Sequence, residues 1–237
     1  MPMPRPAFRG GVVLLAAGLV ALGLATGCKK KSSPTAPTPT PPGPVVNTVN
    51  PAGSAANRDA RTSMKGTVGN ATQTFDDFIS STPATITRIT WQGIYCVENP
   101  NQPPPAPTAQ SFLVGFYADS NNSPNQNAPL ATTVYPLARV AETADATPNG
   151  KCGTAEPTGI GVYNYSLTLD APFSVTPGVR YWLSVMANVN YNFTNSASFI
   201  YWGWRSGTAN NNRSVQIAPN GGITEYPSDR AYSLIQQ

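Results

Sequence analysis

The sequence contains no histidine, and only 11% of its residues are charged. The absence of histidine removes the commonest general base, the usual Ser/His and Cys/His nucleophile pairs and the commonest zinc ligand. No phosphate-binding glycine loop and no dinucleotide-binding fingerprint is present either. The net charge of +4 decreases when the basic N-terminal segment is set aside, and nothing basic enough to bind nucleic acid remains. We therefore expect a protein that does not bind nucleic acid and is not an enzyme.

The N-terminal segment has no apolar run long enough to span a membrane. Its longest apolar stretch extends from Val12 to Leu24. A membrane span needs about 20 apolar residues, so this stretch is too short for one. Arg5 and Arg9 precede it, and small residues and then Cys28 follow it. This order is typical of a secretory signal.

The segment Leu24-Ala25-Thr26-Gly27-Cys28 resembles the lipobox of bacterial lipoproteins. The resemblance implies cleavage before Cys28, attachment of fatty acids such as palmitate to this cysteine, and anchoring in the membrane of the bacterial cell envelope. In that family, aspartate after the cysteine favours retention at the inner membrane. Lys29 occupies this position, so the outer membrane or the cell surface is expected. The alternative is an ordinary secretory cleavage beside an incidental cysteine.

The segment after the acylation site is rich in proline and threonine. Ser32 to Pro44 has too few large apolar residues to bury a core and favours extended polyproline geometry, so we expect a tether. We therefore divide the chain into a signal peptide (1–27), a lipidated linker (28–46) and one domain (47–237).

Residues 47–237 contain many short apolar-polar alternations and no helical periodicity of useful length. Tyr165, Leu167 and Leu169 alternate with polar residues, as in a strand with one buried face. The tetrapeptide Thr176-Pro177-Gly178-Val179 then predicts a type II turn. Roughly eight to ten such strands predict an all-β fold, an antiparallel β-sandwich that is jelly-roll-like.

One strand is expected to contain an irregularity. Between Thr85 and Tyr95, the side chain of Ile86 is out of phase with those of Ile89 and Trp91. A bulge or bend near Thr87 would bring all three to the same face.

Two segments are expected to lack regular structure. Asn47 to Thr72 has few large apolar residues and is interpreted as an irregular lead-in. Asp119 to Pro129 is rich in asparagine and proline and is interpreted as a loop.

A second resemblance covers most of residues 72–235. The ordered landmarks are Asp76-Asp77-Phe78, Ile86-Thr87-Arg88-Ile89-Thr90-Trp91-Gln92-Gly93, Phe112-Leu113-Val114-Gly115-Phe116-Tyr117-Ala118-Asp119, Pro172-Phe173, Tyr181-Trp182-Leu183-Ser184-Val185 and Trp202-Gly203-Trp204. This pattern resembles a β-sandwich domain of secreted and anchored bacterial proteins whose role is uncharacterised. The resemblance supplies no catalytic motif. The chain departs from the pattern in a proline-rich insert after Cys96 and in the segment around Cys152.

Cys96 and Cys152 remain as an even pair if Cys28 carries the lipid. In an oxidising compartment such a pair predicts a disulfide. The alternative is two free thiols that serve chemistry or metal binding, but no CxxC spacing and no histidine supports it.

The remaining candidates for function are carboxylates and aromatics. Asp76, Asp77 and Asp119 are candidate calcium ligands, or they cap strand ends and turns; no other cofactor is expected. Core packing is the general expectation for a tryptophan in a sandwich, and Trp202 and Trp204, which flank Gly203, are the better candidates for exposure and for stacking on a sugar.

These features predict a lipid-anchored envelope protein whose non-catalytic sandwich binds a glycan or an envelope partner, or has a structural role. The alternative is a polysaccharide hydrolase that uses two carboxylates. Its candidates are Asp76, Asp77, Glu98, Asp119 and Asp170.

Overall fold

A computed structural model describes residues 44–46, 59–66, 71–97, 109–146, 150–152, 161–190, 200–207 and 211–236. The chain divides into two units, Met1–Pro39 and Thr40–Gln237, and all described residues belong to the second unit. The predicted signal peptide and the lipidation site Cys28 lie outside the described residues. Among the residues that are described, no helix is long and apolar enough to cross a membrane.

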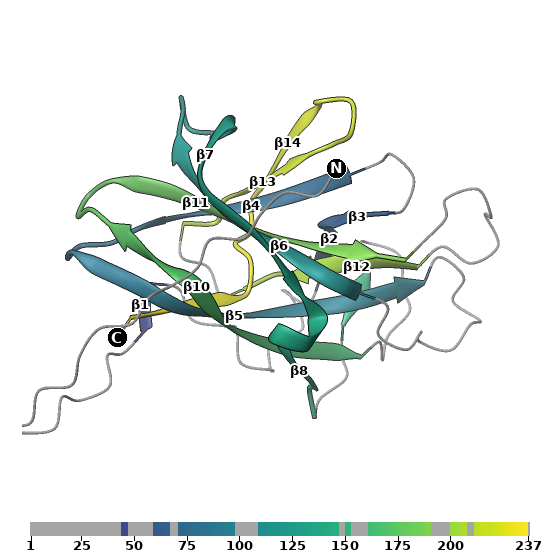
Figure 1. The fold of residues 1–237 in the computed structure, drawn as a ribbon. Helices are drawn as coiled ribbons and strands as arrows, with labels where there is room; N and C mark the ends of the chain where they lie inside the picture. The colour runs from purple at the N-terminus through teal and green to yellow at the C-terminus, as the bar shows by residue number, and fades with distance from the viewer. Residues whose placement is uncertain are drawn as a thin grey trace, which may run out of the picture. The chain divides into compact units, whose positions relative to one another are not determined.

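The described strands form two sheets, which we call sheet A and sheet B (Figure 1). Sheet A contains β1 (Pro44–Val46), β2 (Asp59–Thr62), β5 (Ala84–Val97), β8 (Ala141–Ala144), β9 (Lys151–Cys152), β10 (Val162–Val175), β12 (Ile200–Arg205) and β15 (Tyr232–Gln236). Sheet B contains β3 (Met64–Lys65), β4 (Ala71–Ile79), β6 (Ala109–Asp119), β7 (Pro124–Pro136), β11 (Arg180–Val189), β13 (Ser214–Ile217) and β14 (Ile223–Tyr226). A single 3-10 turn, η1 (Leu137–Arg139), follows β7.

Most strand pairs are antiparallel, and the chain passes repeatedly from one sheet to the other. Strand β5, which with β10 is one of the two longest strands of sheet A, pairs with β10 on one side and with β15 and β12 on the other. In sheet B the order is β14, β13, β4, β3, β11, β6 and β7, with β4 also pairing directly with β11. The predicted all-β sandwich is therefore confirmed.

Local patterns in the sequence explain these elements. Tyr165, Leu167 and Leu169 are buried on β10, as their alternation predicts. At the turn before β11, Gly178 has a φ of 71° and the amide of Val179 donates to the carbonyl of Thr176 at 3.3 Å, in agreement with the type II turn.

The predicted irregularity in β5 is confirmed at Thr87. Ile86 pairs with Gln236, whereas the next β15 residue, Ile235, pairs with Arg88, so Thr87 is the extra residue of a bulge. The bulge shifts the side-chain alternation by one residue. As a result, Ile86 and Ile89 are both fully buried.

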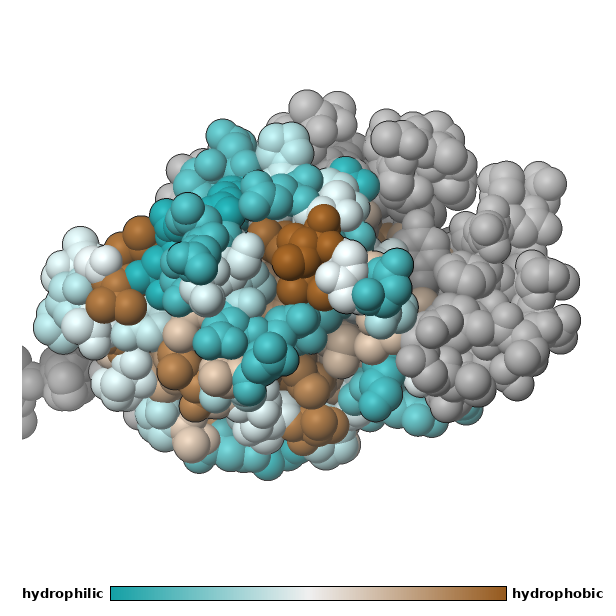
Figure 2. All heavy atoms as spheres, turned by 90° about the horizontal axis from the view of Figure 1, so that it is seen from above, coloured by the Kyte–Doolittle hydropathy of each residue, from teal (hydrophilic) through white to brown (hydrophobic). Residues whose placement is uncertain are grey.

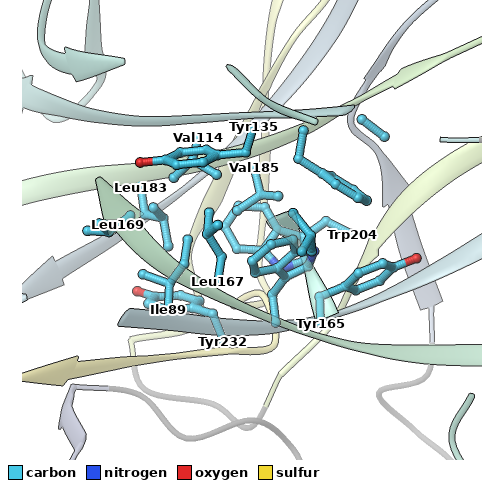
Figure 3. Close-up of a cluster of buried hydrophobic side chains, with 14 of the residues drawn as sticks. Ile89, Val114, Tyr135, Tyr165, Leu167, Leu169, Leu183, Val185, Trp204 and Tyr232 are labelled. Atoms are coloured by element: carbon cyan, nitrogen blue, oxygen red, sulfur yellow. The ribbon is translucent and has the colours of Figure 1, made fainter. Parts of the chain in front are cut away.

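The main core lies between the two sheets. Its side chains point toward one another from both layers (Figure 3), and labelled members include Ile89, Leu167 and Tyr232 from sheet A and Leu183 and Val185 from sheet B. Burial of so many large side chains is the principal stabilising contribution in a sandwich of this size.

The two sheets are joined at Ser63, which lies between β2 in sheet A and β3 in sheet B. Its Oγ donates to the carbonyl of Val185 at 2.6 Å and accepts from the amide of Thr74 at 3.1 Å. Its backbone accepts from the amide of Ala187 and donates to the carbonyl of Trp202. The segment predicted to be irregular therefore contains a corner at which the chain changes sheets.

Candidate functional site

The outer face of sheet B, which points away from the main core, carries its own apolar cluster. Phe75, Tyr117, Trp182, Val215 and Ile217 are buried there. Their places follow from the register, because directly paired residues share a face: Val215 lies opposite Phe75, and Trp182 lies opposite Tyr117. A face that buries three large aromatics and two aliphatic side chains must be covered.

The cover is the hairpin that joins β6 to β7. Two register shifts, one on either side of Tyr117, bend this pair of strands. The guanidinium of Arg213, next to β13, donates to the carbonyl of Asn122 at the hairpin tip. The guanidinium of Arg213 lies 5.4 Å from the centroid of the Trp182 ring of β11, so Arg213 and the hairpin tip meet over the outer face. In Figure 1, β7 and β14 project on the same side of sheet B.

Arg180 holds the same hairpin tip from β11. Its Nη1 donates to Oδ1 of Asn122 at 2.5 Å, and it forms an ion pair with Asp77 at 3.1 Å. Asn121 and Asn122 have φ angles of 53° and 62°, a left-handed conformation that asparagine tolerates better than most residues. The carboxylate of Asp119 accepts from the amide of Asn122, which completes the turn.

A hollow of about 310 Å³ opens beside this covered cluster. It is lined by Ala71 and Gln73 from β4, Gln126 from β7, and Ile217, Ala218, Pro219 and Gly221 from β13 and the turn after it. We call this the sheet-B hollow. Seen from above, this side of the domain has hydrophilic residues interrupted by separate hydrophobic patches (Figure 2). The seven residues that line the hollow provide two amide side chains and small apolar surfaces, and none of them is charged.

Gln73 is held in one orientation by the protein. Its Nε2 donates to the hydroxyl of Tyr117 at 3.1 Å and to Oγ of Ser184 at 3.0 Å. Ser184 in turn donates to the carbonyl of Thr74 at 2.8 Å. Because both N–H groups of the amide are used, its Oε1 is the atom left to accept a hydrogen bond from a ligand.

The position of Tyr117 depends on a glycine. A Cβ at Gly115 would lie 2.6 Å from the tyrosine ring, so only glycine lets this ring lie along the strand toward Gln73. Burial raises the pKa of Tyr117, an effect that the hydrogen bond from Gln73 partly opposes. The phenol therefore remains protonated at neutral pH and keeps an O–H that can donate.

The three candidate calcium ligands do not form a metal site. Asp76 and Asp77 are neighbours on β4 and point to opposite faces. Asp77 and Asp119 both lie beside Arg180, at 3.1 and 4.0 Å, so an arginine occupies the space between these carboxylates. No group of His, Cys, Asp or Glu side chains that could hold a metal ion is found within the described ranges. The calcium prediction is therefore wrong for these residues.

Those carboxylates proposed for hydrolysis that the structure describes are buried or already paired with arginine. Asp76 is fully buried, and burial raises its pKa well above the ordinary value. Asp77 accepts from Asn211 at 2.8 Å, and Asp170 forms an exposed ion pair with Arg139. Glu98 lies outside the described residues. No described pair of these carboxylates faces the sheet-B hollow.

Trp202 and Trp204 are not exposed candidates for stacking on a sugar, since both side chains are fully buried. The ring of Trp202 lies against Gly93, where an added Cβ would approach it to 2.3 Å, and its Nε1 donates to the hydroxyl of Tyr165. The space beside Gly203 is filled by Ala60 of β2. Gly203 allows the protein's own strand to approach closely, and it does not open the face to a ligand.

Cys96 is buried and engaged in a disulfide. Cys152 pairs in register with Ala60, and Ala60 and Cys96 belong to one apolar cluster, so the backbone brings the two cysteines to the same region. The side chain of Cys152 lies outside the described residues, and the pairing of Cys96 with Cys152 stays a prediction.

A family model described as a domain of unknown function, DUF7901, matches residues 57–232. The chain belongs to the DUF7901 family. The match includes both sheets except β1 and most of β15, so the DUF7901 domain and the sandwich are the same unit. Neither the curated proteins nor the solved structures contain a match to the chain.

Proposed function

We propose that this DUF7901 protein is a lipid-anchored protein of the bacterial cell envelope, at the outer membrane or cell surface. The support comes from the order of Arg5 and Arg9, the apolar run, and Leu24-Ala25-Thr26-Gly27-Cys28. The proline-rich segment that follows would hold the sandwich away from the bilayer. We further propose that the sandwich binds an envelope glycan or partner without chemical turnover.

The sheet-B hollow is the observation that supports a binding role. Its two amide side chains come from β4 and β7, and the wall that carries Gln126 is fixed by Arg213 and Arg180. Among the described candidates for hydrolysis, Asp76 is buried and Asp77, Asp119 and Asp170 are paired with arginine, and none of them lines this hollow. A concave site with a few fixed polar groups and apolar surface between them is the usual form of a small-ligand site.

The anchor is tested by growing cells with a labelled palmitate analogue and recovering the full chain. We expect label in the natural protein and in Ser32→Ala, which keeps the lipobox, and none in Cys28→Ala. Label that persists in Cys28→Ala would show that this cysteine is not the acylation site.

The binding role is tested by sedimenting the full chain, solubilised in detergent, with delipidated envelopes. We expect the natural protein to co-sediment and Gln126→Ala to do so more weakly, with no release of soluble reducing sugar. Release of sugar that disappears with a single carboxylate variant would replace the binding role by hydrolysis.

A further inference from the structure

We infer that the ligand of the sheet-B hollow is a neutral saccharide; this inference rests on the proposed binding function and names its ligand. The first argument is charge. Every residue that lines the hollow is an amide or an apolar residue. A phosphate or a carboxylate would enter without an opposite charge to compensate for its lost hydration, which is costly.

The second argument is the match of hydrogen-bonding groups. A sugar hydroxyl both donates and accepts, and an amide side chain offers both functions. Gln126 is exposed and has no hydrogen-bond partner in the described structure, so its carbonyl and its NH2 are both free for a ligand. Gln73 also lines the hollow, and its Oε1 is left for a ligand because its Nε2 already donates to Tyr117 and Ser184. A ligand with several hydroxyl groups can reach both amides at once.

The third argument is the apolar part of the lining. Ile217, Pro219 and Ala71 offer aliphatic surface between the two amides, which suits the C–H face of a pyranose ring. Gly221 has a φ of 80° and has no atoms near the position of a Cβ, so the turn leaves this side of the hollow open. A volume of about 310 Å³ lies at the lower end of the range for ligand sites, roughly 300 to 1,000 Å³, and fits a short saccharide.

One cation stands at the rim. Lys65 pairs with Ala71 across β3 and β4 and is exposed, but its side chain does not line the hollow. An acidic saccharide held by Lys65 would bind in a salt-dependent manner, whereas a neutral saccharide held by amides would be nearly insensitive to salt.

The experiment measures binding of the full chain in detergent micelles to immobilised hexasaccharides. The neutral probes are cellohexaose, maltohexaose, mannohexaose and chitohexaose, and the acidic probe is a galacturonic acid hexamer. Gln126→Ala and Gln73→Leu test the two amides. Gln110→Ala is the matched control, because Gln110 is an exposed glutamine of β6 that does not line the hollow.

We expect at least one neutral hexasaccharide to bind, with the same affinity at low and high salt. Loss of one hydrogen-bonding amide in Gln126→Ala should weaken the affinity about three- to tenfold. Gln73→Leu should weaken it at least as much, and Gln110→Ala should leave it unchanged. Gln126 is exposed, so its variant remains informative even if Gln73→Leu is unstable.

Several results would overturn the inference. Equal affinity of Gln126→Ala and the natural protein for the saccharide would show that the saccharide binds elsewhere. If only the acidic hexamer binds, and Lys65→Ala abolishes that binding, the ligand is an acidic saccharide and not a neutral one. Envelope co-sedimentation without binding to any hexasaccharide would leave the proposed binding function intact and remove the saccharide. Failure of both assays would remove both proposals.

Discussion

Removal of one buried hydroxyl, in Ser63→Ala, should destabilise the whole sandwich. Ser63 is completely buried at the point where the chain leaves sheet A and enters sheet B. Its Oγ is the donor to the carbonyl of Val185 and the acceptor for the amide of Thr74. Alanine fills nearly the same volume, so the change removes these two hydrogen bonds and little else.

The expected loss of stability follows from the two groups that Ser63→Ala leaves without this hydroxyl, the carbonyl of Val185 and the amide of Thr74. Thr74 and Val185 are fully buried, so water cannot replace the lost hydroxyl. A buried polar group without a partner costs about 1–3 kcal/mol. Because a carbonyl has a second lone pair, we expect about 2–4 kcal/mol for the two groups together. With a urea m-value of about 2 kcal/mol/M, the midpoint should fall by about 1–2 M.

The assay is urea unfolding followed by tryptophan fluorescence, since all four tryptophans are buried in the native state. Ser174→Ala is the control, because Ser174 is exposed on β10 and its change should alter stability by less than about 0.5 kcal/mol. A midpoint for Ser63→Ala within the range of the control would refute the role of this residue as the joint between the sheets.

Three further predictions concern the core packing, a buried carboxylate and the disulfide. Gly93→Ala should destabilise the fold by about 1–3 kcal/mol and lower its melting temperature, because the new Cβ would lie 2.3 Å from the ring of Trp202; an unchanged melting temperature would contradict this packing. Burial raises the pKa of Asp76 above its ordinary value of 3.8, so the unfolded chain ionises first as the pH rises and the free energy of unfolding falls. Asp76→Asn should therefore have little effect near pH 4 and should be more stable than the natural protein at pH 8 in urea titrations; equal shifts at both pH values would exclude this linkage. A Cys96–Cys152 disulfide closes a loop of about 55 residues and should contribute about 4 kcal/mol. Non-reducing peptide mapping should find the linked pair, and two alkylatable thiols in the native protein would exclude it.

Features set by local alternation could be predicted from the sequence. The bulge at Thr87 follows from parity alone, because Ile86 and Ile89 cannot both face a core on a regular strand. The turn at Gly178 follows from the backbone angles that proline and glycine favour. In both cases the information lies within a few residues.

Features that depend on distant partners could not be predicted in this way. Alternation places Trp202 and Trp204 on one face, but it does not say whether another layer covers that face. The covering strand, β2, is only four residues long and lies in a segment with few large apolar residues. The side chain of Ala60 is small enough to approach Gly203, and no local sequence pattern predicts this contact.

The sheet-B hollow could not be predicted from the sequence for a related reason. The prolines and asparagines of residues 124–129 indicate a loop, yet these residues belong to β7. Strand β7 lies at the edge of sheet B, where a proline costs no ladder hydrogen bond on the open side. Gln73 and Gln126 line the same hollow because the β6–β7 pair is bent by two register shifts, and two single glutamines give no signal in a sequence.

The contacts of Arg213 and Arg180 with Asn122, at the tip of the β6–β7 hairpin, should also increase affinity at the proposed site. A weak ligand with many hydroxyl groups gains little per contact, so any loop that must become ordered on binding would consume much of that gain. Arg213 and Arg180 fix the tip at Asn122 before a ligand arrives, and Tyr117 and Ser184 fix Gln73 in the same way. Both amides of the hollow are thus on elements whose positions other residues determine. Under the proposed function, the buried aromatics would act as the rigid base of the hollow and would not touch the sugar themselves.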